Sequence, residues 1–221
     1  MTWNCSGRFT TKWATLIDMA ADLAVIQECE PETVAFAADH GWGAIRTGSG
    51  SKGLAVLASP GWGLHESPRD SLYSCTARVT GPVEFTLVGF WALTPSLARS
   101  SYLAQGEELA AHVSAVEGPV VVAGDFNTTT EPRHLNTFAA LEAEGLVSAF
   151  HQSHGVERGA EPDDTYFHHW HKEEGFHIDL MFLPHTWEID SVTLGTFEKF
   201  TEMKISDHVP LIVDVDEGAL R

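Results

Sequence analysis

Cysteine is scarce in this chain of 221 residues. Its three cysteines are Cys5, Cys29 and Cys75. They are odd in number and form no CxxC pair, which argues against a disulfide framework and against a zinc knuckle. We therefore expect a protein of the reducing cytoplasm, with Cys5 and Cys29 in its core.

Long apolar runs and a basic leader are also missing. No apolar stretch approaches the roughly 20 residues that a membrane-spanning helix needs. The first five residues lack the basic start of a signal peptide, and Arg8 and Lys12 interrupt the first apolar run. The sequence therefore predicts no membrane partner, and a monomer is the simplest expectation.

Positive charge is in short supply. Thirteen Lys and Arg residues stand against 31 Asp and Glu residues, which gives a net charge of −18. Proteins that hold long DNA without sequence preference neutralise its phosphates with a basic stripe, and no such stripe is visible. Two interpretations stay open. Either the charge serves solubility alone, or any phosphate contact depends on bound cations or on a small substrate.

The chain does have a regular alternation of apolar segments and turn signals, and 43% of its residues are hydrophobic. Short apolar runs bounded by Gly and Pro predict strands, and apolar spacing near 3.6 predicts helices. The expected strands are 1–4, 23–26, 54–58, 71–79, 85–93, the valine segment that begins at 119, 178–182, 187–194 and 210–215. Gly81-Pro82 marks a hairpin turn between two of them.

Helices are expected between these strands, at 32–40, 100–117, 132–144 and around the stripe of Trp13, Leu16, Ile17 and Ala20. Thr129 or Thr130 can cap the helix at 132–144, with Pro132 in its first turn. The His-rich stretch 151–177 is expected to be a polar loop. This order predicts an α/β protein in which two sheets pack face to face with helices outside, as one domain over 1–221.

Polar side chains stand at the ends of five of the apolar strands. Strand ends are where a rigid scaffold aims side chains into a cleft. Asp125 and Asn127 are two residues apart, so in an extended chain they point to the same face. The full set of candidate site residues is Asn4, Glu28, Asp125, Asn127, Asp179, Asp207 and His208.

These residue types suit the hydrolysis of a phosphate ester. Oxygen ligands such as Asn4, Glu28 and Asp207 prefer a hard cation, Mg²⁺ or Mn²⁺, to zinc. Such a cation offsets the phosphate charge. Asp125 and Asn127 can deprotonate or orient a water, and a histidine oriented by a carboxylate, His208 with Asp179, can move a proton. Each motif alone could also be a simple turn or helix start; the full set favours the catalytic interpretation.

Asn4 apart, these residues belong to four motifs: "VIQE" at 25–28, "GDFN" at 124–127, "HIDLMF" at 177–182 and "SDHVPL" at 206–211. Together with Asn4, the motifs resemble the endonuclease/exonuclease/phosphatase superfamily. That group includes DNase I-like nucleases and exonuclease III-like AP endonucleases. The resemblance implies a four-layer α/β/β/α sandwich with the site at one edge of the two sheets. It also implies that Asn4, Glu28 and Asp207 form the metal site. Asp125, Asn127 and the His208–Asp179 pair would be catalytic.

The chain departs from the family pattern at one strand end. Where the family has a His or Tyr that meets the phosphate, "LVGFWALTP" at 87–95 places Trp91. Tryptophan donates one N–H and cannot shuttle protons. Tyr102 or a histidine of 165–177 is a candidate substitute. His168, His169 and His171 could bind a metal themselves, but an aromatic, polar loop on the substrate side is the preferred interpretation.

The favoured function is therefore a divalent-metal-dependent phosphodiester hydrolase of the nuclease type, acting on nucleic acid or a small phosphodiester. Two alternatives stay open. One is a phosphatase or phosphoesterase for small molecules, which fits the charge of −18. The other is a weakened member that binds a nucleotide or a protein partner, which Trp91 suggests. A glycosidase built on paired carboxylates is a poor fit, because it needs no Asn4 or Asp207-His208.

Overall fold

Two six-stranded sheets form the centre of the computed structural model, which describes residues 1–216 except 49, 68–70, 72 and 129–134. The first sheet has the order β13 (Ile189–Leu194), β14 (Leu211–Val215), β1 (Thr2–Asn4), β2 (Leu23–Cys29), β4 (Gly53–Ala58) and β3 (Gly43–Thr47). The second has the order β5 (Gly63–Glu66), β6 (Ser74–Thr80), β7 (Phe85–Trp91), β8 (Val120–Asp125), β12 (Asp179–Pro184) and β9 (Leu146–Ser148). A two-stranded hairpin of β10 (Tyr166–Phe167) and β11 (Gly175–Phe176) stands apart from both sheets.

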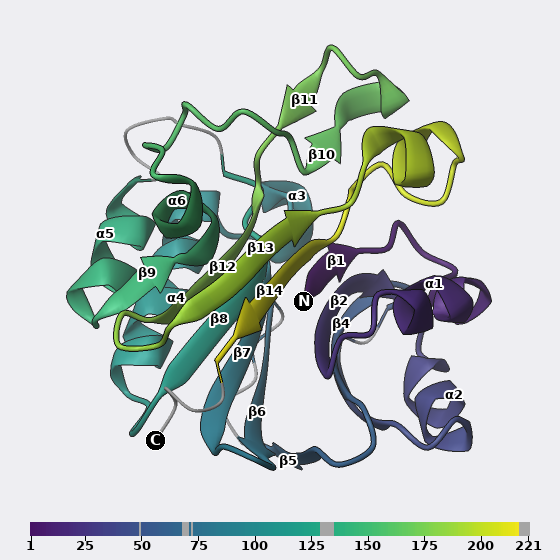
Figure 1. The fold of residues 1–221 in the computed structure, drawn as a ribbon, viewed down its shortest axis with the longest axis horizontal. Helices are drawn as coiled ribbons and strands as arrows, with labels where there is room; N and C mark the ends of the chain where they lie inside the picture. Colours follow the sequence, from purple (N-terminus) through teal and green to yellow (C-terminus); the bar gives the residue numbers. More distant parts are fainter. Residues whose placement is uncertain (49, 68–70, 72, 129–134, 217–221) are drawn as a thin grey trace.

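Helices cover the outer face of each sheet, on opposite sides of the molecule (Figure 1). Beside the first sheet lie α1 (Trp13–Asp18) and α2 (Thr33–Asp39), preceded by a 3₁₀ turn at Phe9–Lys12. The second sheet is covered by α4 (Tyr102–Ser114) and α5 (Leu135–Ala143), while α3 (Pro95–Ala98) and α6 (Ala149–His154) are short. A 3₁₀ turn at His168–Trp170 and a π-helical turn at Glu198–Glu202 complete the chain. The fold is the predicted four-layer sandwich.

The valine-rich strand β8 shows why the sequence of a central strand is a continuous apolar run. Val121 and Ala123 pack into the core between the two sheets, whereas Val120 and Val122 pack under the helices. Successive side chains of a strand point to opposite faces, so a strand covered on both faces is apolar at every position. This double burial anchors β8 up to Asp125, its last residue.

The structure corrects several predicted elements. The first helix ends at Asp18, and Ile17 is 45% exposed, so the apolar stripe does not continue to Ala20. The stretch 151–177 is not a single loop, because it contains part of α6 and the β10–β11 hairpin. The strands β3, β5 and β9 were not predicted. The hairpin at Gly81-Pro82 joins β6 to β7 as expected, and the proposed caps Thr129 and Thr130, with Pro132, lie outside the described residues.

Within the part of the chain that the structure describes, no helix is both long and apolar enough to cross a membrane. Cys5, Cys29 and Cys75 are buried, and Cys5 and Cys29 belong to the core beside α1 and α2, as predicted.

Candidate active site

A cavity of about 520 Å³ opens at the strand ends. β1 and β2 run parallel, as do β7 and β8, and residues at the C-terminal ends of all four strands line this cavity. Six of the seven predicted site residues line this cavity: Asn4, Glu28, Asp125, Asn127, Asp207 and His208. The seventh, Asp179, is fully buried and reaches the site through His208.

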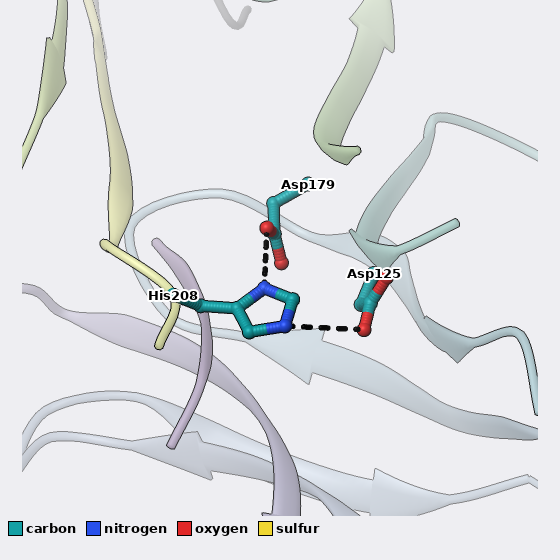
Figure 2. Close-up of side chains that lie close together, drawn as sticks. All are labelled: Asp125, Asp179 and His208. Atoms are coloured by element: carbon teal, nitrogen blue, oxygen red, sulfur yellow. Dashed lines mark hydrogen bonds and ion pairs between the residues drawn. The ribbon is translucent and has the colours of Figure 1, made fainter. Parts of the chain in front are cut away.

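His208 lies between two carboxylates, as Figure 2 shows. Its Nδ1 donates to Oδ2 of Asp179 at 2.8 Å, and its Nε2 lies 4.0 Å from Oδ2 of Asp125. The three residues are at most 5% exposed. Burial alone would lower the pKa of His208, but the carboxylates of Asp179, Asp125 and Asp207 raise it above its usual range. The site therefore favours an imidazolium held in a fixed orientation.

Asp125 also has a shifted pKa. Asp125 and Asp179 are paired in register across β8 and β12, which places their side chains on the same face. Burial and the charge of Asp179 raise the pKa of Asp125, and His208, Asn4 and Asn127 partly offset that rise. The Asn4 amide donates to Oδ2 of Asp125 at 3.0 Å, and the backbone N–H of Asn127 donates to Oδ1 at 2.9 Å. A carboxyl with a raised pKa, oriented by two amides, is suited to accept a proton.

Asn127 reaches the cavity by a different route from the one expected. Strand β8 ends at Asp125, and Asn127 has a left-handed backbone with φ of 46°. The alternation argument for a shared face is therefore wrong, although both residues line the cavity. Asparagine tolerates this conformation better than most residues. Its amide donates to the backbone oxygen of Ala92 at 2.8 Å, which fixes the side chain at the end of β7.

Glu28 is turned out of its strand by a bulge. The pairing of β2 with β4 shifts register between Gln27 and Cys29, and Glu28 has a φ of 63°. Bulges of this kind re-aim a side chain next to active sites. Here the carboxylate enters the cavity and makes an ion pair with Lys52.

The oxygen donors of Asn4, Glu28 and Asp207 fit a hard divalent cation. All three line one cavity, and two of them are carboxylates. The phenol of Tyr166 gives a second indication that the acids converge. Burial raises the pKa of Tyr166, and the charges of Asp207, Asp125 and Glu28 raise it further. Asn4 Oδ1 already accepts from the backbone of Ser6 at 3.0 Å, and a carbonyl oxygen has a second lone pair for a cation.

Asp125, Asp179 and His208 also bring three donor atoms within 4.8 Å of one another. Nδ1 of His208 is engaged with Asp179, which leaves Nε2 as its free nitrogen. We therefore interpret these three as one electrostatically coupled group, in which Nδ1 of His208 is hydrogen-bonded to Asp179 and Nε2 faces Asp125 without a hydrogen bond.

Two residues of the cavity were missed in the sequence. Lys52 lies in the glycine-rich segment "GSGSKG" at 48–53, between β3 and β4, and that glycine content was the available signal. Tyr166 belongs to the His-rich segment, and its ring lies 4.6 Å from the ring of His208. Its hydroxyl is hydrogen-bonded to Nδ1 of His168 at 2.8 Å.

Trp91 is where the sequence placed it. It is the last residue of β7, pairs in register with Asp125 and lines the cavity. Tyr102, a candidate substitute, begins α4 and is not among the described residues that line this cavity. His168 and Trp170 do not share the face of an extended chain, because His169 and Trp170 have positive φ within a 3₁₀ turn.

The comparisons with known proteins agree with this fold. The chain is similar in structure to an AP endonuclease from Archaeoglobus fulgidus, with 18% identity, 97% of this chain and 98% of that chain covered, and a TM-score of 0.75. It is also similar to TDP2 from D. rerio, solved with a single-stranded DNA product, with 16% identity, 97% of both chains covered and a TM-score of 0.74. The 3′-5′ exonuclease NExo from Neisseria meningitidis gives 17% identity, coverage of 97% and 98%, and a TM-score of 0.72.

At these identities the likeness concerns the fold. None of the curated protein sequences matches this chain. A family sequence model, described as the Endonuclease/Exonuclease/phosphatase family, matches residues 1–208 and so includes all seven candidate site residues. The chain therefore belongs to the endonuclease/exonuclease/phosphatase family.

Proposed function

We propose that the protein is a phosphodiester hydrolase of the nuclease type that depends on Mg²⁺ or Mn²⁺. The observation that carries this proposal is the His208–Asp179 pair facing Asp125 in a cavity that Asn4, Glu28 and Asp207 also line. Membership of the family supports phosphoester hydrolysis in general. DNA-bound structures of similar fold, such as TDP2 with a single-stranded DNA product, support a nucleic acid as substrate.

Asn4, Glu28 and Asp207 are the residues that would hold the cation. When bound, a divalent cation supplies charge that offsets the phosphate and polarises one of its oxygens. The net charge of −18 makes such a positive centre necessary for a phosphate to enter a cavity lined with carboxylates.

The remaining roles belong to the side chains of the chain itself. Asp125, with its raised pKa, accepts a proton from the attacking water, and Asn4 and Asn127 hold its two oxygens in place. His208, kept cationic by Asp179, directs Nε2 at the charge that develops on the phosphoryl oxygens. Asp179 fixes the orientation of the imidazole and acts through His208.

Two features support a second candidate. Lys52 is the one Lys or Arg among the described residues that line the cavity, and Trp91 stands in place of a His or Tyr. A small phosphoester requires fewer cationic contacts than a polymer, so a small-molecule phosphoesterase is the alternative, and a weakened binding member is the third. We also propose that residues 1–221 form a single domain, because the family model already spans residues 1–208. We further propose that this domain acts as a monomer.

The test is hydrolysis of bis-p-nitrophenyl phosphate, single- and double-stranded DNA, abasic DNA and RNA, with Mg²⁺ or Mn²⁺ and with EDTA. We expect turnover that EDTA abolishes. His208→Ala should lower kcat by about 10²- to 10⁴-fold, the range of general acid–base catalysis, and Asp179→Asn should lower it in the same direction. His185→Ala, an exposed histidine outside the cavity, is the control.

The outcomes separate the candidates. EDTA-sensitive turnover confined to small esters would favour the small-molecule phosphoesterase. No EDTA-sensitive turnover on any substrate would overturn the proposal of an enzyme. Turnover that His208→Ala leaves unchanged, in a variant with the wild-type melting temperature, would instead overturn the assignment of the site.

A further inference from the structure

Lys52 makes an ion pair with a residue that the proposed metal site also needs. Its ammonium binds Oε2 of Glu28, and the two side chains are 52% and 19% exposed. Lys52 and Glu28 line the same cavity as Asp207 and His208. The site therefore contains a positive group of its own, located at one of its candidate metal ligands.

The loop that carries Lys52 is held beside Glu28 by an arginine. The guanidinium of Arg46 donates to the backbone oxygens of Gly48 at 2.6 Å and of Gly50 at 3.1 Å. It also donates to the backbone oxygen of Cys29 at 3.2 Å, the residue that follows Glu28. Arg46 thus connects the backbone of the loop to the backbone of the bulge in β2. These hydrogen bonds keep Lys52 close to Glu28.

The ammonium of Lys52 and a divalent cation compete for the carboxylate of Glu28, so each weakens the binding of the other. Both are positive, and at contact distance in a partly buried site their repulsion is large. An exposed lysine–carboxylate pair contributes only about 0–1 kcal/mol, so a divalent cation can displace it. The displaced ammonium stays on a flexible four-carbon stem in the same cavity, where a phosphate is the natural anionic partner.

With Trp91 at the end of β7, a contact with the phosphate is left for another residue, such as Lys52, to make. The strand end at Trp91 lacks the proton-bearing His or Tyr of the family pattern, and an indole offers a single N–H. Lys52 is the one Lys or Arg among the described residues that line the cavity with Trp91. A lysine that approaches from the loop at 48–53 can supply the contact with a phosphate oxygen that the end of β7 does not.

We propose that Lys52 exchanges partners: it neutralises Glu28 in the metal-free protein and, once a divalent cation takes Glu28, contacts the phosphate of the substrate. The second half rests on the proposed function, whereas the first half concerns the protein and the cation alone. Lys52 is thus both a competitor of the metal and a substrate-binding residue. No bond is formed or broken in the exchange.

The first test measures Mn²⁺ binding without substrate, by the loss of the free-ion signal in electron paramagnetic resonance. Lys52→Gln should bind Mn²⁺ about two- to fivefold more tightly than wild type. In this variant the cation no longer has to displace an exposed ion pair that contributes at most about 1 kcal/mol. The matched control is Lys172→Gln. It removes the same charge from another exposed Lys–Glu pair, Lys172–Glu198, outside the cavity, and should keep the wild-type affinity.

The second test measures steady-state hydrolysis of bis-p-nitrophenyl phosphate at saturating Mg²⁺. Lys52→Gln should lower kcat/KM by about tenfold or more, the effect of losing one charge-assisted hydrogen bond, while Lys172→Gln should not. Lys52→Arg keeps the charge and should recover most of the loss.

The outcomes are distinguishable from those that test the proposed function. If wild type hydrolyses the ester but Lys52→Gln leaves Mn²⁺ affinity and kcat/KM unchanged, the exchange is wrong and the function stands. If Lys52→Gln tightens Mn²⁺ binding but no substrate is turned over, the competition stands and the function is wrong. Equal changes of Mn²⁺ affinity and kcat/KM in Lys52→Gln and Lys172→Gln would show that only the net charge matters, and would overturn the proposal.

Discussion

His177 is a half-buried base two residues before Asp179. Its Nδ1 is hydrogen-bonded to the backbone oxygen of Asp163 at 2.8 Å, so Nδ1 carries the proton and Nε2 is an acceptor. Nε2 is buried without a hydrogen-bond partner among the described residues, and the ring lies 4.3 Å from that of Phe150. Burial is the main reason that the pKa of His177 is lowered. The folded protein therefore holds His177 in its neutral form.

This predicts a loss of stability on mild acidification. The unfolded chain takes up the proton near the ordinary histidine pKa of about 6.5, while the folded chain takes it up only at lower pH. The contribution of His177 is therefore complete above that value and declines as the pH falls below it. Melting temperatures between pH 7.5 and 5 should fall less in His177→Gln than in wild type. His65→Gln, an exposed histidine, should follow wild type, and parallel curves for all three would contradict the assignment.

At the residue level the sequence predicted side chains that sit in local motifs. Asp125, Asp207 and His208 were found because each follows or precedes an apolar strand. Lys52 and Tyr166 were missed because their importance comes from contacts across the chain. Lys52 is 24 positions from Glu28, and Tyr166 reaches His208 from a separate hairpin. Spacing along a sequence does not encode such approaches.

Among the elements, the parallel strands β7 and β8 approach closely at Gly124. Gly124 pairs in register with Phe90, and a Cβ at Gly124 would lie 1.7 Å from the Phe90 backbone oxygen. No side chain can be accommodated without moving the two strands apart. Glycine in "GDFN" therefore serves the close approach of β7 and β8, one residue before Asp125.

Gly124→Ala should destabilise the protein by about 3 kcal/mol, at the upper end of the range for overpacking, because the backbone must shift. Chemical denaturation measures the loss, and activity should fall with it because Asp125 moves. The control is Gly43→Ala in β3, where a Cβ meets its nearest neighbours at an ordinary 3.8 Å. A Gly124→Ala variant as stable as Gly43→Ala would show that the strands can separate at little cost.

The three strands of the large sheets that periodicity missed share one property. β3, β5 and β9 are edge strands of the two sheets. Edge strands are short and partly exposed, so they lack the apolar runs that identified the central strands. Positive φ at Glu28 and Asn127 was equally invisible, because a bulge and a left-handed turn depend on pairing with neighbouring strands.

On the scale of the whole molecule, the charge of −18 limits how the proposed nucleic-acid substrate can be held. Each phosphate neutralised by Lys or Arg contributes about −1 to the slope of log binding constant against log salt concentration. With Lys52 as the one Lys or Arg among the described residues of the cavity, the slope for duplex DNA should be shallower than about −2. Fluorescence anisotropy with His208→Ala measures it without cleavage. A slope steeper than about −5 would reveal a basic surface elsewhere.

The overall architecture was predictable from the sequence for two reasons. Alternating apolar segments of the right lengths predicted two sheets with helices outside. The family resemblance that the ordered motifs carry implied the four layers and a site at one edge. The packing of one sheet against the other was not predictable, because the core between them is assembled from Val25, Val56, Val121 and Met181, which come from distant parts of the chain.

The strand order of the first sheet has a consequence for the growing polypeptide. β1 lies between β2 and β14, and Thr2 pairs with Leu211. Asp207 and His208 precede β14, so they reach the cavity when this last strand docks on the first one. During translation, Asn4, Glu28 and Asp125 leave the ribosome long before their partners. A nascent chain therefore lacks part of the proposed site, and, on the proposed function, a chain terminated before β14 should not hydrolyse phosphodiesters.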